Sequence, residues 1–143
     1  MTLEPLEQNE EIVEKLRAYW KTRNLHFDSD WTREYLQKGH IHDLKTDEFF
    51  VYREEGEVKG MISLLTDVSG VAEIRDEIRF DGGELKPILQ ALTALAHERK
   101  IRKLFAFVLQ KNLGVYQDLG FKREGTLKDH FVQGENLIIM SKF

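Results

Sequence analysis

Near its C-terminus the chain reads Tyr116-Gln-Asp-Leu-Gly-Phe121-Lys-Arg-Glu-Gly125, a segment that indicates the end of a helix followed by a strand. A short helical pattern ends at Gly120, and a strand begins at Phe121. Further along, Gln133-Gly134 is typical of a turn. We therefore expect a helix near residues 112–119, a strand near 121–131 and a last strand that ends at Lys142.

Two strong apolar patterns precede this stretch. Residues 104–109 form a continuous apolar run, which is typical of a strand buried on both faces. Before it, apolar side chains recur three and four residues apart, and Pro87 falls in the first turn of the expected helix, where proline is tolerated. This helical stripe consists of Leu85, Ile88, Leu89, Leu92, Leu95 and Ala96.

Residues 71–80 alternate in polarity, as a half-buried strand does. The pattern predicts an apolar face made of Ala72, Ile74, Ile78 and Phe80, and a charged face made of Glu73, Arg75, Glu77 and Arg79. Asp76 interrupts the apolar face. It is expected either at a β-bulge or beside a buried hydrogen-bond donor.

The N-terminal half contributes two helical patterns and a hairpin. Asn9 is placed to cap a helix over residues 10–23, and a shorter helix is expected from Asp30 to near Gly39. Strand-forming residues from Glu48 to Arg53, a turn, and a second strand over residues 58–66 predict a hairpin. The complete order, ααβββαβαββ, describes an α/β domain with a mixed sheet.

Composition narrows the classes of function. A length of 143 residues fits one domain, here taken as residues 1–143. The absence of cysteine excludes disulfides and thiolate chemistry, and a formal charge of -4 weighs against a nucleic-acid partner. No apolar run approaches the roughly 20 residues that span a bilayer, and the acidic start lacks the features of a signal peptide. We expect a cytoplasmic protein that binds neither nucleic acid nor membrane.

The element order and three local motifs resemble the GCN5-related N-acetyltransferase (GNAT) family over roughly residues 48–143. The motifs are the hairpin Gly56-Glu-Val-Lys-Gly60-Met-Ile, the segment Tyr116-x-x-x-Gly120-Phe121, and Gly134 followed by Met140. The resemblance implies the acyl-CoA N-acyltransferase fold, a mixed, mostly antiparallel sheet flanked by helices. It also implies acetyl-CoA as co-substrate and a small-molecule or peptide amine as acceptor. Because the family's last strands often carry dimer contacts, a homodimer is left open.

The family binds the pyrophosphate of acetyl-CoA with an Arg/Gln-x-x-Gly-x-Gly/Ala loop, and here the corresponding segment matches it incompletely. One register places Arg79 and Gly82 on the first two motif positions, whereas registering on the following helix places Gly83 on the first glycine. In addition, Asp81 and Glu84 have the spacing of a capping box, which would put carboxylates at a helix N-terminus that favours phosphate.

The family also has an asparagine seven residues before its tyrosine. Here Leu109 occupies that place and Asn112 lies only four residues before Tyr116, so the last helix is expected to start late. We take Arg79, Gly82, Gly83, Leu109 and Asn112 as the candidate cofactor-binding residues.

Three residues are catalytic candidates by resemblance. Tyr116 would protonate the leaving thiolate of CoA, and Glu73 or Glu77 would act as general base through a water or attract a cationic amine. The alternatives are a tyrosine that packs between helix and sheet, and a solvated strand face on which Glu73 and Glu77 pair with neighbouring arginines.

Other polar groups are explained better by structure than by catalysis. The pair His40 and His42 has no third ligand at a suitable spacing, so no metal site is predicted. The basic run at residues 99–103 suits a helix C-terminus. Asp129 and His130 match the family's acceptor pocket in position only.

Three hypotheses about function remain from the sequence. The first is an acetyl-CoA-dependent N-acetyltransferase. The second is a catalytically degenerate module of the same fold that binds a ligand or protein partner. A module that binds another acyl donor or an unrelated small molecule ranks last.

Overall fold

The structure, a computed structural model, describes residues 2–6, 10–36, 41–42, 45–130 and 133–143. Its centre is an eight-stranded sheet of order β1-β3-β4-β5-β6-β8-β7, with β2 paired to β3 beside this path. Among the described strands, β5 and β6 are the one parallel pair, and the other pairs are antiparallel. The strands are β1 (Thr2–Pro5), β2 (Ile41–His42), β3 (Lys45–Glu54), β4 (Glu57–Asp67), β5 (Val71–Arg79), β6 (Lys103–Leu109), β7 (Lys122–Leu127) and β8 (Leu137–Lys142).

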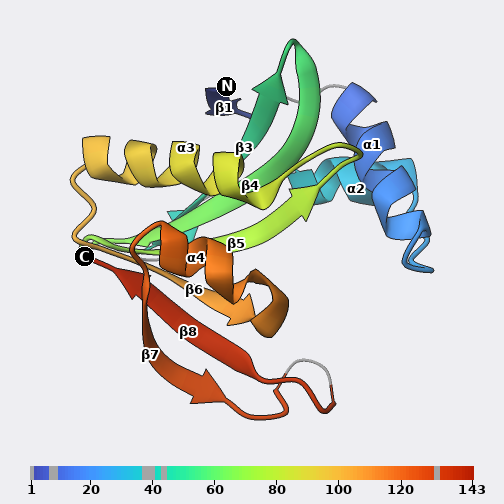
Figure 1. The fold of residues 1–143 in the computed structure, drawn as a ribbon. Helices are drawn as coiled ribbons and strands as arrows, with labels where there is room; N and C mark the ends of the chain where they lie inside the picture. The colour runs from blue at the N-terminus through green and yellow to red at the C-terminus, as the bar shows by residue number, and fades with distance from the viewer. Residues whose placement is uncertain (1, 7–9, 37–40, 43–44, 131–132) are drawn as a thin grey trace.

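Helices cover both faces of the sheet (Figure 1). On one face, α3 and α4 share a core with the strands; its largest members include Tyr52, Ile62, Leu64, Ile88, Leu89, Leu92, Ile138 and Met140. On the other face, α1 and α2 cover the N-terminal strands through a second core that includes Ile12, Leu16, Trp20, Met61, Ile78 and Phe80. The helices are α1 (Glu10–Lys21), α2 (Ser29–Leu36), α3 (Leu85–Glu98) and α4 (Leu113–Asp118), and a 3-10 turn, η1 (Gln110–Asn112), precedes α4.

Most of the predicted elements are confirmed, as is the α/β class with a mostly antiparallel sheet. The last helix starts late, as the position of Asn112 indicated. The sequence did not predict β1 or β2. The first of these adds four residues to the sheet edge by pairing with β3, and the second only two. Asn9, His40 and residue 131, on which three expectations rested, lie outside the described residues.

The predicted two faces of β5 are wrong, and a bulge at Asp76 is the reason. The pairing of β4 with β5 shifts by one residue between Met61 and Ser63, and Asp76 has a positive φ of 46°. An extra residue in a strand moves every later side chain to the opposite face. Ala72 and Ile74 therefore join the α3 and α4 core, whereas Ile78 and Phe80 join the α1 and α2 core.

The charged residues separate in the same way. Glu73 and Arg75 lie on the face of α1 and α2, whereas Glu77 and Arg79 lie on the face of α3 and α4. Both explanations offered for Asp76 are confirmed, since it sits in the bulge and its Oδ2 accepts a hydrogen bond from the buried Ser63 Oγ at 3.4 Å.

The prediction that β6 is buried on both faces is also wrong. Leu104, Ala106 and Val108 are buried under α3 and α4, but Phe107, on the opposite face, is 46% exposed. The helices α1 and α2 do not extend over this part of the sheet (Figure 1). No helix among the described residues is long and apolar enough to cross a lipid bilayer.

Candidate active site

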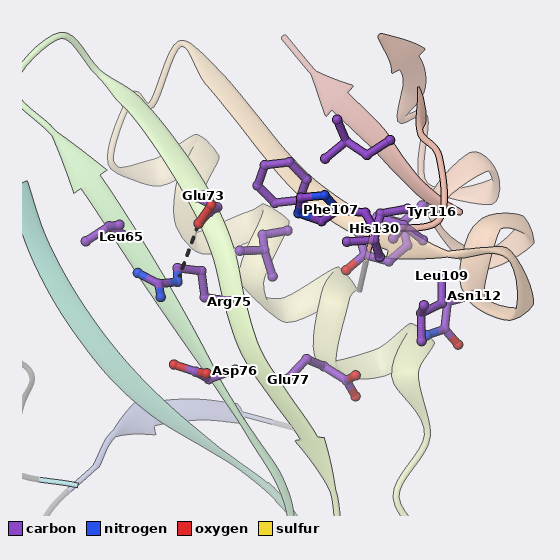
Figure 2. Close-up of a pocket in the computed structure, with 14 residues that line it drawn as sticks. Leu65, Glu73, Arg75, Asp76, Glu77, Phe107, Leu109, Asn112, Tyr116 and His130 are labelled. Carbon is purple, nitrogen blue, oxygen red and sulfur yellow. Dashed lines mark ion pairs between the residues drawn. The ribbon is translucent and has the colours of Figure 1, made fainter. Parts of the chain in front are cut away.

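The candidate site lies where β5 and β6 separate. The two parallel strands pair from Val71 with Lys103 to Ile74 with Ala106, and no pairing is made beyond that point. A cleft of about 910 Å³ opens there, lined by residues of β5, β6, α4 and the β7–β8 hairpin (Figure 2). The bulge at Asp76 lies where the two strands separate. Because a bulge bends its strand, the part of β5 that follows Asp76 no longer runs alongside β6.

Glu77 is the buried carboxylate of the cleft. Its side chain is 18% exposed, and its Oε1 lies 2.9 Å from Arg79 Nε in an ion pair. Burial raises the pKa of Glu77 above its usual range, and the charge of Arg79 opposes that rise only in part. A carboxylate with a raised pKa is a stronger base than an exposed one, which suits it to accept a proton.

Tyr116 reaches the same cleft from α4. It is only 5% exposed, and its ring packs edge-on against Phe121 at a centroid distance of 5.1 Å. Burial raises the pKa of Tyr116 strongly, and the negative charge of Glu77 raises it further. The phenol therefore stays protonated at neutral pH and can donate its proton to a developing anion.

Glu73 lines the cleft from the other face of β5. Its Oε2 lies 3.4 Å from Arg75 Nε, so the pairing of charges along this strand that we weighed against catalysis is present. Figure 2 shows Glu73 and Glu77 pointing in different directions from the strand. The two carboxylates therefore have different surroundings, and only Glu77 is on the side of Tyr116.

Leu109 and Asn112 complete the α4 side of the cleft. Leu109 ends β6 in an extended conformation just before η1, and the side chain of Asn112 does not cap α4. Leu127, Leu137 and Phe107 also line the cleft. Sequence reasoning missed all three. Alternation within residues 103–109 would have separated Phe107 from its buried neighbours, but a run without polar residues hides that signal.

The connection from β5 to α3 consists of a hydrogen-bonded turn followed by a helix N-terminus without a side-chain cap. The Gly83 N–H donates to the Phe80 carbonyl at 2.8 Å, and Gly82 has a positive φ of 77°, as the third residue of a type II turn requires. The predicted capping box is wrong. The N-cap is Glu84 itself, and its side chain makes no capping hydrogen bond to α3. The N–H groups that begin α3 are left for solvent or for an anion.

Arg79, Gly82 and Gly83 lie apart from the cleft, around smaller hollows beside α1. The basic run forms surface pairs, as expected of structural charges: Arg99 with Glu48 at 2.6 Å and Lys103 with Glu124 at 2.7 Å. Within the described parts of the chain, no group of three or more His, Asp or Glu is arranged to hold a metal ion.

Comparison with solved structures identifies the class of fold. The chain has the fold of the GCN5-related N-acetyltransferases, with matches that cover nearly its whole length. Comparison at the level of sequence finds no matching family model and no matching curated protein.

Three of the matching structures illustrate the likeness. A ribosomal-protein-alanine N-acetyltransferase from Brucella melitensis is 18% identical with a TM-score of 0.74, and the match covers 100% of this chain and 99% of that one. Mutant forms of a spermidine/spermine N-acetyltransferase from Vibrio cholerae are 20% identical, with a TM-score of 0.74 and coverages of 99% and 93%. An aminoglycoside 6'-N-acetyltransferase complexed with coenzyme A is 13% identical, with a TM-score of 0.71 and coverages of 99% and 96%.

Proposed function

We propose that this protein, taken as a single domain over residues 1–143, is an acetyl-CoA-dependent N-acetyltransferase that acts on a primary amine of a small molecule or peptide. The observation that carries the proposal is that a buried carboxylate, Glu77, and a buried phenol, Tyr116, line the same cleft and that the charge of Glu77 raises the pKa of Tyr116. The matching structures are N-acetyltransferases, and one of them is a complex with coenzyme A, which supports the choice of donor.

The cleft has the groups that a thioester donor needs. Beyond the Ile74–Ala106 pair, the edges of β5 and β6 that face each other are unpaired and offer backbone N–H and C=O groups to an extended ligand. Leu109 and Asn112 would border the donor on the α4 side. The uncapped start of α3 would favour its phosphates, since a helix N-terminus attracts anions.

The reaction follows from the two buried groups. Glu77, directly or through a water, would accept a proton from the ammonium or amine of the acceptor. The amine nitrogen then attacks the thioester carbonyl carbon, so that a C–N bond forms and the C–S bond breaks. Tyr116 would give its proton to the departing thiolate. Starting from the ammonium form of the acceptor, the nitrogen loses a second proton on becoming an amide, and this proton restores the tyrosine through water, while the proton taken by Glu77 returns to solvent.

The acceptor is expected to carry positive charge. Glu73, Asp76 and Glu77 line the cleft together with a single arginine, Arg75, which is paired to Glu73. The exposed ring of Phe107 also lines the cleft, and an aromatic ring can attract a cation. An amine with an apolar or aromatic body would fit these surroundings better than an acidic one.

Calorimetric titration with acetyl-CoA tests the proposal. We expect saturable binding in the micromolar range, typical of substrates of enzymes, and no comparable heat from ATP, which has the nucleotide without the pantetheine arm. An absence of binding at millimolar acetyl-CoA would remove the acetyltransferase from consideration.

One observation favours the second candidate, a non-catalytic module of this fold. The turn from Phe80 to Gly83 uses a loop N–H internally, and the glycine motif that would bind pyrophosphate is incomplete. This module would bind acetyl-CoA or a partner without releasing free thiol. Thiol release on incubation with a panel of polyamines, aminoglycosides and N-terminal peptides separates the two candidates.

A further inference from the structure

Apolar side chains lie together on the part of the sheet made by β6, β8 and the end of β7. Phe107 is the cross-strand neighbour of Ile139, and Leu127 is that of Leu137. Paired residues, and residues two apart on one strand, lie on the same face of a sheet, so these four side chains form one surface, here called the apolar strip. None of the four is buried, and Phe107 is 46% exposed. The helices α1 and α2, which cover the same face over the N-terminal strands, do not reach it (Figure 1).

The apolar strip continues into the candidate active site. Phe107, Leu127 and Leu137 line the cleft, and so does Glu73 (Figure 2). The parallel ladder places Glu73 beside Phe105, whose ring packs edge-on against that of Phe107 at a centroid distance of 6.0 Å. The charged stretch of β5 and the apolar strip are therefore neighbours on one face of the sheet.

Among the described residues, the negative charge of the cleft comes from β5. Its three carboxylates there are Glu73, Asp76 and Glu77, and Arg75 forms an ion pair with Glu73 at 3.4 Å. The β7–β8 hairpin adds His130 and two leucines to the described lining, but no carboxylate. A ligand that spans the cleft therefore meets negative charge at one end and apolar surface at the other.

We propose that the apolar strip binds the body of the acceptor and so selects primary amines with one positive charge and an alkyl or aromatic body. Such selectivity deepens the proposed function, on which it rests. A body that lies on Phe107 leaves water and covers apolar surface of the protein, and both changes favour binding. A second ammonium group on the strip would lose hydration without gaining a carboxylate from the described lining, so polyamines are poor acceptors.

Continuity with the cleft identifies the occupant of the strip. Three of its four side chains also line the space in which the acceptor would react, so a molecule that reaches Glu77 from this face passes over them. The position of the carboxylates fits the same molecule, because they lie where its ammonium group would enter. A second copy of this chain is the other occupant that an open apolar face admits, and its presence is an outcome of the experiment below.

Titration calorimetry with amines tests the strip. Coenzyme A is present in place of acetyl-CoA, so that no acetyl group can be transferred. We expect 2-phenylethylamine to bind about tenfold or more tightly than 1,4-diaminobutane, since it alone buries an apolar body. From butylamine to octylamine, each added methylene should raise the affinity about twofold, less than complete burial would give, because one side of the chain stays in water.

Two variants locate the effect. Phe107→Ser should lower the affinity for 2-phenylethylamine about tenfold and that for 1,4-diaminobutane less than about twofold, because the ring is removed from under the apolar body. Phe143→Ser is the matched control, since Phe143 is 82% exposed and lies outside the cleft lining. It should bind both amines as the unaltered protein does. Thermal unfolding checks that both variants fold.

Equal affinities for the two amines, an alkylamine series without a trend, or an unchanged affinity in Phe107→Ser would overturn the strip as an acceptor site. Sedimentation velocity tests the second copy. A dimer that Phe107→Ser converts to a monomer, with amine affinities unchanged, would assign the strip to that copy and overturn the inference. Tight binding of 2-phenylethylamine without release of thiol from acetyl-CoA would remove the acetyltransferase alone, whereas acetyl transfer to polyamines in preference to apolar amines would remove the strip alone.

Discussion

Tyr116 is placed where burial and a neighbouring charge act on its hydroxyl in the same direction. Both raise its pKa, so the phenol is a proton donor over the physiological range and the phenolate is strongly disfavoured. The raised pKa also makes the phenol a weaker acid than an exposed tyrosine. Under the proposed function, its hydroxyl would stabilise the departing thiolate first by a hydrogen bond and then by transfer of the proton.

Tyr116→Phe should therefore lower kcat about 100-fold while the affinity for acetyl-CoA stays within about twofold, because general acid catalysis contributes about that much. The matched control is Tyr52→Phe. Tyr52 is 1% exposed, and its hydroxyl has no hydrogen-bond partner in the described residues, so that variant should keep full activity. Steady-state kinetics and calorimetry provide the two measurements. Equal kcat in the two variants would exclude Tyr116 from the mechanism.

Glu77 gives a pH dependence whose sign can be worked out. Burial raises its folded-state pKa above the ordinary value of 4.5, so the base is protonated, and inactive, at a pH where an exposed glutamate is still ionised. The acidic limb of kcat/KM should lie above that ordinary value and should disappear in Glu77→Gln. Because the folded state holds its proton more tightly than the unfolded chain, ionised Glu77 costs stability as pH rises through this window.

Glu77→Gln should consequently raise the midpoint of thermal unfolding at neutral pH and leave it unchanged at pH values well below 4.5. Glu73→Gln is the matched control, since Glu73 lies on the same strand but on the other face. It should keep the acidic limb. If the acidic limb of kcat/KM disappears in Glu73→Gln instead, Glu73 and not Glu77 would be the base.

At the scale of the element, β5 depends on one residue with unusual backbone geometry. Asp76 has a φ of 46°, which aspartate and asparagine adopt far more readily than β-branched residues do. Asp76→Val should lower the free energy of unfolding by about 2 kcal/mol, whereas Asp76→Asn should change it by less than about 0.5 kcal/mol. Urea denaturation measures both. Similar stabilities would mean that the bulge is not held by this conformation.

The β5–α3 connection offers a second comparison within one chain. A Cβ at Gly83 would lie 2.2 Å from the backbone oxygen of Lys59, too close to be accommodated without moving the turn. Gly83→Ala should cost about 2 kcal/mol or more and weaken acetyl-CoA binding. Nothing lies within 4 Å of a Cβ at Gly114, a helical position, so Gly114→Ala should stabilise the protein by about 1 kcal/mol. A Gly83→Ala variant with an unchanged free energy of unfolding would show that the turn can shift to accommodate the added methyl group at little cost.

Sequence patterns predicted the elements but not how one of them is bent. The alternation of residues 71–80 is regular apart from Asp76, and a periodic pattern cannot state whether an odd residue is tucked into a face or bulged out of the strand. For this reason the sequence placed Glu73 and Glu77 on one face of the strand, whereas the bulge places them on opposite faces. The pairing of Glu77 with Arg79, which the alternative of a charge-paired strand face predicted, is present in the structure.

The short strand β1 at the edge of the sheet was not predicted for a different reason. β1 contains four residues, one of them Pro5, and it is stabilised by pairing with β3 some fifty residues away. No local signal encodes such a pairing. The resemblance at residues 116–140 succeeded because it rests on the order of several elements, whereas the fit of the donor loop rested on a single imperfect motif.

For the molecule as a whole, the seam between β5 and β6 is the shortest of the ladders that join β3 to β7 through the sheet. Only four residue pairs join these strands, and everything from β6 onward is connected to the N-terminal strands by this ladder and by the core beneath α3. Beyond the last pair of this ladder, the cleft separates β6 and the later elements from the N-terminal strands. A ligand that lies in the cleft and bonds to both strands would therefore tie the two parts of the molecule together.

Acetyl-CoA at about 100 times its dissociation constant should raise the free energy of unfolding by about 2.7 kcal/mol, which for a chain of this size corresponds to roughly 10 °C in the midpoint. Differential scanning fluorimetry measures the shift, and amide hydrogen exchange should report its location, with the largest gain in protection at the ends of β5 and β6 that line the cleft. Adenosine 3',5'-bisphosphate at the same multiple of its own dissociation constant is the control. It should raise the midpoint equally but leave exchange at the seam unchanged, because it lacks the arm that would enter the cleft. Equal protection of the seam by both ligands would show that stabilisation spreads through the fold without a ligand between the strands, and the cleft would then lose its place as the donor site.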